Sequence, residues 1–441
     1  MSNGFGLSVT AARPALLAGS DNTVEVAVRI QAPDTPEGGP RRPRLNMALV
    51  IDRSGSMSGQ PLQEAKRCAI TIIDRLNATD IASVIAYDDH VRVVAEAQPV
   101  KNKERLKAAV ARIQEGGSTN LHGGWLKGAE EAAKNLSAST VSRVLLLSDG
   151  NANSGITNID EIASQCAQLA ETGVTTSTYG LGHSFNEDLM VAMARSGRGR
   201  EYYSETADAL LERFQEEFSL LEHLCGRDVR LRVKALPELS CELLNLYLPI
   251  EEGCWRLPDL AYGGEAWAAF RLQVKASCVP HVGQKLNLMQ VAVHYRKLDG
   301  SKCAMPKPHV SLPVLNEEDF RKLPEDETVK QYVNEAEAAR LQELTAQAAR
   351  AGDWKQVDAL LVQAPAMAAK NPLLQKIFAN LKDLADHREA DRLSKEGRYA
   401  ARSMGVWIRS KNVYPGASMD ALPEYLHRRV HQGRKHEDDE K

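Results

Sequence analysis

The 441-residue sequence has few aromatic residues, no long apolar run and no excess of basic charge. Aromatic residues make up 5% of the chain and the formal net charge is -3, so the chain lacks the basic surface that is typical of nucleic-acid-binding proteins. No run of about 18 apolar residues is present, and we therefore expect no membrane-spanning helix. Because the N-terminus also lacks the basic and apolar regions of a secretory signal, we expect a cytoplasmic protein.

Cysteine pairs with the spacing of zinc ligands are also missing. The 7 cysteines are scattered, and none forms a CxxC pair. The pattern that comes nearest to a zinc site, Cys278-Val-Pro-His281, has no second pair to complete it. An odd and scattered set favours reduced thiols that act as small apolar residues over disulfides or metal ligands.

Changes in hydrophobic periodicity divide the chain into five segments. Residues 1–44 and 225–324 contain short alternating runs that are typical of strands. Residues 45–224 alternate strands with helices, which predicts a doubly wound, mainly parallel α/β sheet covered on both faces. Because the first segment has too few strands to be stable alone, we expect both β segments to form one β-sandwich into which the α/β unit is inserted. A C-terminal α-helical region, 325–408, and a tail, 409–441, follow.

The C-terminal region is rich in alanine and keeps a helical period. This period predicts helices over residues 329–350, 354–362 and 373–394, with breaks at Gly352 and Pro372. The tail is punctuated by proline and glycine and ends in a run of charged residues, so we expect it to be partly disordered.

The most informative stretch follows the first apolar strand of the α/β segment. The run from residue 45 to residue 51 ends in Asp52, and Ser54 and Ser56 come directly after it. Ligands of open α/β sheets bind beyond the carboxyl ends of such strands. A carboxylate and two hydroxyls are hard oxygen donors, which suit Mg²⁺, Mn²⁺ or Ca²⁺. Serine and glycine clusters are usually plain turns, so this stretch alone is weak evidence.

Two later residues complete a recognisable set. Thr119 precedes a predicted helix, and Asp149 ends the most apolar strand of the chain. The order DxSxS, then threonine, then aspartate resembles the metal-ion-dependent adhesion site (MIDAS) of von Willebrand factor A domains. The resemblance covers roughly residues 45–224. The wider layout is similar to bacterial relatives of inter-alpha-trypsin inhibitor heavy chains and of calcium-activated chloride channel proteins.

The resemblance implies a role for each of the five residues. Ser54 and Ser56 would coordinate the metal directly through their hydroxyls, and Thr119 would do so in the ligand-bound state. Asp52 and Asp149 would hold the ion mostly through water and orient the hydroxyls. Mg²⁺ is the default ion, because it retains waters and accepts few protein ligands, although Mn²⁺ or Ca²⁺ would also suit these donors. Neutral ligands leave the charge of an ion under-neutralised, which favours an acidic ligand from outside.

The same resemblance implies a non-enzymatic function. It predicts a metal-dependent interaction module or adaptor that binds an Asp or Glu side chain of a partner protein. Bacterial proteins of this kind resemble adaptors of MoxR-class AAA+ ATPases, which makes such an ATPase a candidate partner.

Several alternatives stay open. The same ion could serve a hydrolase or a phosphoryl-transfer enzyme, but this would require a general base or a second metal, and no motif supplies one. Asp88, Asp89 and His90 form a predicted hairpin tip, which we interpret as a solvated turn. His122 could flank the metal site, although its position at the start of a helix is an ordinary one.

Overall fold

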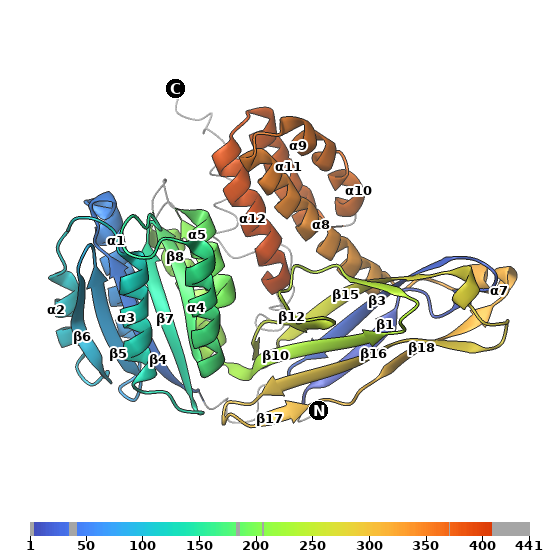
Figure 1. Ribbon diagram of the computed structural model, residues 1–441, viewed down its shortest axis with the longest axis horizontal. Coiled ribbons are helices and arrows are strands. Elements are labelled where there is room, and N and C mark those ends of the chain that lie inside the picture. Colours follow the sequence, from blue (N-terminus) through green and yellow to red (C-terminus); the bar gives the residue numbers. More distant parts are fainter. Residues whose placement is uncertain (1–3, 35–41, 182–185, 205–206, 370, 408–441) are drawn as a thin grey trace, which may run out of the picture. The chain divides into compact units, whose positions relative to one another are not determined.

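The computed structural model describes residues 4–34, 42–181, 186–204, 207–369 and 371–407, which are shown in Figure 1. The chain forms two compact units. The first unit is made of Met1–Pro40, Cys225–Lys297 and Ser301–Lys441, and the second of Arg41–Leu224 and Leu298–Gly300. The α/β unit is therefore an insertion between two β segments of the chain.

The second unit contains a six-stranded sheet with the strand order β6-β5-β4-β7-β8-β9. All neighbouring strands are parallel except β5 and β6, because only residues 88–90 connect these two strands. The predicted doubly wound, mainly parallel sheet is thereby confirmed. The strands are β4 (Arg44–Asp52), β5 (Ile81–Tyr87), β6 (Val91–Pro99), β7 (Thr140–Ser148), β8 (Val174–Leu181) and β9 (Arg198–Ser204).

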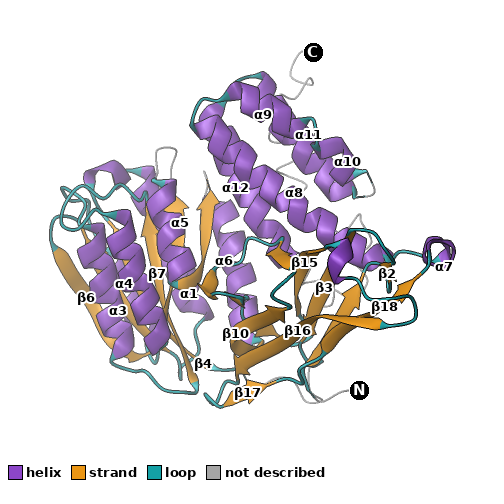
Figure 2. Ribbon diagram, turned by 45° about the vertical axis from the view of Figure 1, so that its right-hand side comes forward, coloured by secondary structure: helices purple, strands orange, loops and turns teal. Residues whose placement is uncertain are grey.

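Helices cover both faces of this sheet (Figure 2). Met47, Leu49 and Ile51 of β4 share a core with α1, α2 and α6. Ala48 and Val50 point to the opposite face and share a core with α3, α4 and α5. This alternation is the period of two of a strand that is buried on both faces. The helices are α1 (Gln60–Arg75), α2 (Lys103–Ala111), α3 (Leu121–Ala133), α4 (Ile159–Thr172), α5 (Glu187–Ser196) and α6 (Ala207–Glu222).

Two glycines let α3 approach the sheet closely. A Cβ atom at Gly128 would clash with Val50, and one at Gly124 would clash with Tyr87. We expect Gly128→Ala to lower the free energy of unfolding by about 1–2 kcal/mol, because overpacking outweighs the gain in helix propensity. Urea unfolding measures this difference. An unchanged or higher stability would show that Val50 can move aside.

The first unit contains two sheets that enclose one core. A four-stranded sheet has the order β1-β3-β15-β11, and β12-β13-β10-β16-β18-β2 is the main path of an eight-stranded sheet. Val28 of β3 and Leu231 of β10 belong to the shared hydrophobic core. The strands are β1 (Gly6–Ala11), β2 (Leu16–Leu17), β3 (Asn22–Gln31), β10 (Leu224–Ala235), β11 (Ser240–Leu243), β12 (Pro249–Glu251), β13 (Cys254–Arg256), β14 (Leu260–Ala261), β15 (Glu265–Val274), β16 (Lys285–Arg296), β17 (Lys302–Ala304) and β18 (His309–Leu315).

N-terminal and later strands pair directly in this unit. β3 runs antiparallel to β15, from Asn22 opposite Val274 to Gln31 opposite Glu265, and β2 is parallel to β18. The two β segments therefore fold as one body.

The C-terminal helices of the first unit begin with α8, which packs on the four-stranded sheet through a stacked Trp267–Tyr332 pair. The single helix predicted over residues 373–394 is wrong, because the chain turns at Arg388, which has a φ of 55° and separates α11 from α12. The tail prediction lies outside the described residues. None of the described helices combines the length and the apolar content needed to span a bilayer. The helices are α7 (Glu317–Lys322), α8 (Glu327–Arg350), α9 (Trp354–Leu361), α10 (Ala364–Ala368), α11 (Pro372–Asp386) and α12 (Ala390–Trp407).

Candidate metal centre

Asp52 lies at the carboxyl end of β4 and is fully buried. One carboxylate oxygen accepts the backbone N–H of Ser54 at 2.9 Å. The other accepts the hydroxyl of Ser148 at 2.6 Å and the hydroxyl of Tyr87 at 3.0 Å. Burial raises the pKa of Asp52, hydrogen bonds from Ser148 and Ser54 oppose this rise, and the negative charge of Asp149 adds to it. A cation beside these two carboxylates would relieve the cost of their burial.

The loop after β4 is hydrogen-bonded to the loop that carries Thr119. The Gly55 N–H donates to the Gly117 carbonyl at 2.8 Å, and the Gly116 N–H donates to the Arg53 carbonyl at 2.7 Å. The Arg53 guanidinium forms an ion pair with the Asp88 carboxylate at 2.6 Å. These contacts bring the DxSxS stretch and Thr119 to the same edge of the sheet.

The interpretation of Asp88 as part of a solvated turn is wrong, because its side chain is buried. It pairs with Arg53 and accepts the backbone N–H of His90 at 2.8 Å. Burial alone would raise the pKa of Asp88, but the hydrogen bond from His90 and the charge of Arg53 lower it. Gly116 packs so closely on this carboxylate that a Cβ atom would clash with it. Asp88 therefore stabilises the two loops that carry Arg53 and Gly116, while Asp89 and His90 are exposed.

Thr119 is held by the loop that follows β7. Its backbone N–H donates to the Asn153 side chain at 2.7 Å, and its carbonyl accepts the N–H groups of Asn153 and Ser154, each at 3.1 Å. Asp149 belongs to the same loop, where one of its carboxylate oxygens accepts the Asn151 N–H at 3.1 Å. All three donor segments are thus connected by hydrogen bonds.

The hydroxyl oxygens suit a small divalent ion. The Ser54 Oγ and Ser56 Oγ atoms lie 3.2 Å apart. Two neighbouring ligands of an octahedral Mg²⁺ ion are about 3 Å apart, given metal–oxygen distances of about 2.1 Å. The Thr119 side chain is buried, and its hydroxyl forms no hydrogen bond with any described residue. The five oxygen-bearing side chains therefore fit a resident metal ion, and the Thr119 hydroxyl has no competing hydrogen bond among the described residues.

Comparison with known protein families identifies the type of domain that the α/β unit contains. The family described as "von Willebrand factor type A domain" matches residues 46–217. This range contains all five predicted metal ligands. Residues 46–217 form a von Willebrand factor type A domain.

Curated relatives match about half of the chain or less. The uncharacterized protein sll0103 of Synechocystis sp. is 33% identical over 226 residues, which are 51% of this chain and 52% of that protein. Inter-alpha-trypsin inhibitor heavy chain H3 of Mus musculus is 29% identical over 194 residues, which are 41% of this chain and 22% of that protein. The chain thus spans about half of the first relative's length and less of the second's.

Two solved structures resemble the chain beyond the A domain. A von Willebrand factor type A protein from Catenulispora acidiphila has a TM-score of 0.65 at 18% identity and covers 86% of this chain and 90% of that chain. The ArnB paralog VWA2 from Sulfolobus acidocaldarius has a TM-score of 0.57 at 18% identity and covers 90% of this chain and 99% of that chain. The fold around the A domain is therefore shared with both proteins.

Several residues that organise the A-domain site were not predicted as functional. Tyr87 lies directly opposite Asp52 in the register of β5 and β4, so alignment of the predicted parallel strands could have revealed it. Asn153 has no comparable signal in the sequence. His122 does not carry a free imidazole: its Nε2 lies 2.8 Å from the Gln165 side chain, which belongs to α4.

Proposed function

We propose that the chain is a non-enzymatic, metal-dependent protein-interaction module. A divalent cation, Mg²⁺ in the first place, would be held by Ser54, Ser56 and Thr119 directly and by Asp52 and Asp149 largely through water. When bound, the ion supplies an open coordination position for the carboxylate of an Asp or Glu on a partner protein. The observation that carries this proposal is the convergence of hydroxyl donors at a buried pair of carboxylates.

The residues around the metal site have separate tasks in this proposal. One oxygen of Asp52 accepts hydrogen bonds from Tyr87 and Ser148, which hold the carboxylate in place beside the proposed ion. The Ser54 and Ser56 hydroxyls are neutral ligands that leave the ion electrophilic. An acidic side chain from outside would then be favoured at the open coordination position, because the direct ligands of the ion are neutral.

The proposed partner is a MoxR-class AAA+ ATPase, and the proposed compartment is the cytoplasm. The proposed partner rests on the resemblance to bacterial adaptor proteins. The sandwich would present the A domain to such an assembly, and the C-terminal helices would supply a second binding surface.

Binding to a purified MoxR-class ATPase tests the proposal directly. We expect surface plasmon resonance to detect binding of the full chain in Mg²⁺ and at least a ten-fold loss of affinity in EDTA. The Ser54→Ala/Ser56→Ala variant should lose binding to the same extent. Ser58→Ala removes a hydroxyl from an exposed residue two positions beyond Ser56 and should bind like the wild type, because this hydroxyl donates to Glu115 and not to a proposed metal ligand.

Two outcomes would contradict this proposal. Equal affinity in Mg²⁺ and EDTA would move the interaction to the sandwich or to the C-terminal helices. Metal-dependent turnover of phosphoesters that disappears in the Ser54→Ala/Ser56→Ala variant would favour the alternative of a hydrolase or a phosphoryl-transfer enzyme.

A further inference from the structure

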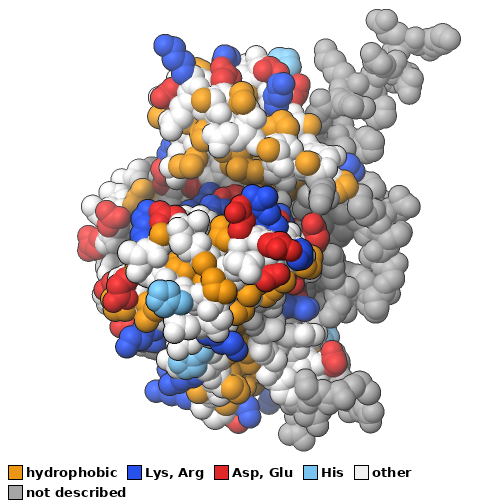
Figure 3. All heavy atoms as spheres, turned by 90° about the vertical axis from the view of Figure 1, so that its right-hand side faces the viewer, with side chains coloured by type: hydrophobic (Ala, Val, Ile, Leu, Met, Phe, Trp, Pro, Cys, Tyr) orange, Lys and Arg blue, Asp and Glu red, His pale blue; other side chains and the backbone are white. Residues whose placement is uncertain are grey.

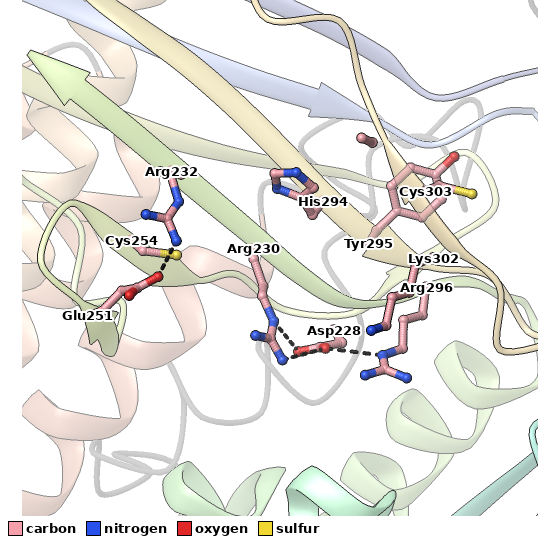
Figure 4. Close-up of a pocket in the computed structure, with 11 residues that line it drawn as sticks. Asp228, Arg230, Arg232, Glu251, Cys254, His294, Tyr295, Arg296, Lys302 and Cys303 are labelled. Carbon is pink, nitrogen blue, oxygen red and sulfur yellow. Dashed lines mark hydrogen bonds and ion pairs between the residues drawn. The ribbon is translucent and has the colours of Figure 1, made fainter.

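A cationic cavity of about 380 Å³ lies in the first unit (Figure 4). The five residues of the proposed metal site belong to the second unit. Strands β10, β13, β16 and β17 and the end of β12 supply its walls. The lining residues are Asp228, Arg230, Arg232, Glu251, Cys254, His294, Tyr295, Arg296, Lys302, Cys303 and Ala304.

The strand period explains why cations gather here. On β10, the buried Leu231 and Val233 belong to the core, so Arg230 and Arg232 project from the opposite face of the sheet. The register then places cations directly opposite one another. Arg230 faces Arg256, and Arg296 faces Lys302.

Like charges directly opposite on a sheet are destabilising, so this arrangement requires compensation. Asp228 supplies part of it, since its carboxylate accepts hydrogen bonds from Arg230 at 2.8 Å and from Arg296 at 3.4 Å. Figure 4 shows both arginines pointing toward this carboxylate, with Lys302 beside Arg296. Asp228 has a φ of 51° and lies where the β10–β16 register shifts, a distortion that often marks functional sites.

The carboxylates that line the cavity balance its positive charge only in part. Glu251 pairs with Arg232, but the Lys302 ammonium and the His294 imidazole have no hydrogen-bond or ion-pair partner among the described residues. The lining carries four permanently cationic side chains and two carboxylates, a net charge of +2, in a chain whose net charge is -3. On the face drawn in Figure 3, by contrast, acidic and basic side chains are interspersed.

We propose that this cavity binds a small molecule that carries a phosphate group. Guanidinium groups match phosphate oxygens, and a phosphate monoester has a charge of about -1.5 to -2 near pH 7, which balances the lining. Cys254 and Ala304 add small side chains to the lining, and the volume lies within the range of about 300–1,000 Å³ of ligand sites. This site is additional to the proposed function, because it uses none of the five metal ligands.

Calorimetric titration of the full chain tests the proposal, with EDTA present so that the metal site does not contribute. The probes are inorganic phosphate and glycerol 3-phosphate at constant ionic strength, with succinate as a dicarboxylate of similar charge. We expect binding of at least one phosphate probe, and the probe that binds more tightly identifies a free phosphate or an ester as the source. Arg232→Gln and Lys302→Gln should each weaken binding about ten-fold.

The matched control is Lys285→Gln, which removes the same charge from an exposed position at the other end of β16. Its affinity for the phosphate probe should equal that of the wild type. Equal weakening by Lys285→Gln and Lys302→Gln would overturn the proposal, because it would show a general charge effect. Succinate bound as tightly as phosphate, or no binding of either phosphate probe, would overturn it as well.

Discussion

Replacing Ser54 and Ser56 together by alanine is expected to weaken Mg²⁺ binding on the order of 100-fold or more and to leave the A domain folded. Changes to residues that merely orient metal ligands already cost about 10–100-fold in affinity, and these two hydroxyls are the proposed direct ligands. The two hydroxyl oxygens lie 3.2 Å apart, which is long for a hydrogen bond between hydroxyls, so the loss of this contact removes little internal structure. Calorimetry on metal-stripped protein measures the affinity, and circular dichroism with thermal melting reports the fold.

Ser58→Ala is the matched control, since it removes a hydroxyl from the same loop at an exposed position. It should bind Mg²⁺ like the wild type. An unchanged Mg²⁺ affinity in the Ser54→Ala/Ser56→Ala variant would refute the assignment of both ligands. Mg²⁺ at 100 times its dissociation constant should also stabilise the wild type by about 2.7 kcal/mol and the double variant hardly at all.

Asp52→Ala is a poorer test of the metal site, because its effect would combine two causes. The carboxylate accepts hydrogen bonds from Ser54, Tyr87 and Ser148 in a fully buried position. Each donor left without an acceptor costs about 1–3 kcal/mol, so the variant would lose stability as well as metal affinity.

The largest expected effect on stability belongs to a buried ion pair between β7 and α6. Arg143 pairs with Glu217, and both side chains are almost inaccessible to water. Glu217 also accepts the hydroxyls of Ser177, at 2.6 Å, and of Tyr179. Glu217→Leu is expected to lower the free energy of unfolding of the A domain by about 3–5 kcal/mol, because it leaves the Arg143 guanidinium buried without its counter-charge. Chemical unfolding followed by circular dichroism measures the loss.

A double-mutant cycle separates the interaction energy of the Arg143–Glu217 pair from the effects of the surrounding side chains. Arg143→Met/Glu217→Leu removes both charges and should recover a large part of the stability that either single variant loses. Lys127→Met/Glu130→Leu is the control for an exposed pair on α3, for which we expect an effect below about 1 kcal/mol. Losses below 1 kcal/mol in each single variant, at Arg143 and at Glu217, would show that water reaches this network in solution.

Burial raises the pKa of Tyr179 well above its ordinary value. The phenol therefore remains a neutral hydrogen-bond donor to Glu217 at the neutral pH of these measurements.

The sequence by itself determined the strand–helix alternation of the A domain and the order of its five proposed ligands. These features are local: β4 and β7 each contain an apolar run, Asp52 is the last residue of β4, and Asp149 directly follows β7. The carboxyl ends of parallel neighbours meet at one edge, so the convergence of the two loops could be predicted without any contact being known. The break at Arg388 could not, because helical periodicity continues across it.

Only the tertiary structure decided which side chains support these features. Asp88 looks like a solvated turn residue in the sequence, yet Arg53 and Gly116 enclose it. The cationic cavity depends on the register between β10, β13, β16 and β17, whose residues are up to 76 positions apart, from Asp228 to Ala304. The physical reason is that periodicity and turn chemistry specify local elements, whereas burial, ion pairing and cross-strand charge depend on long-range packing.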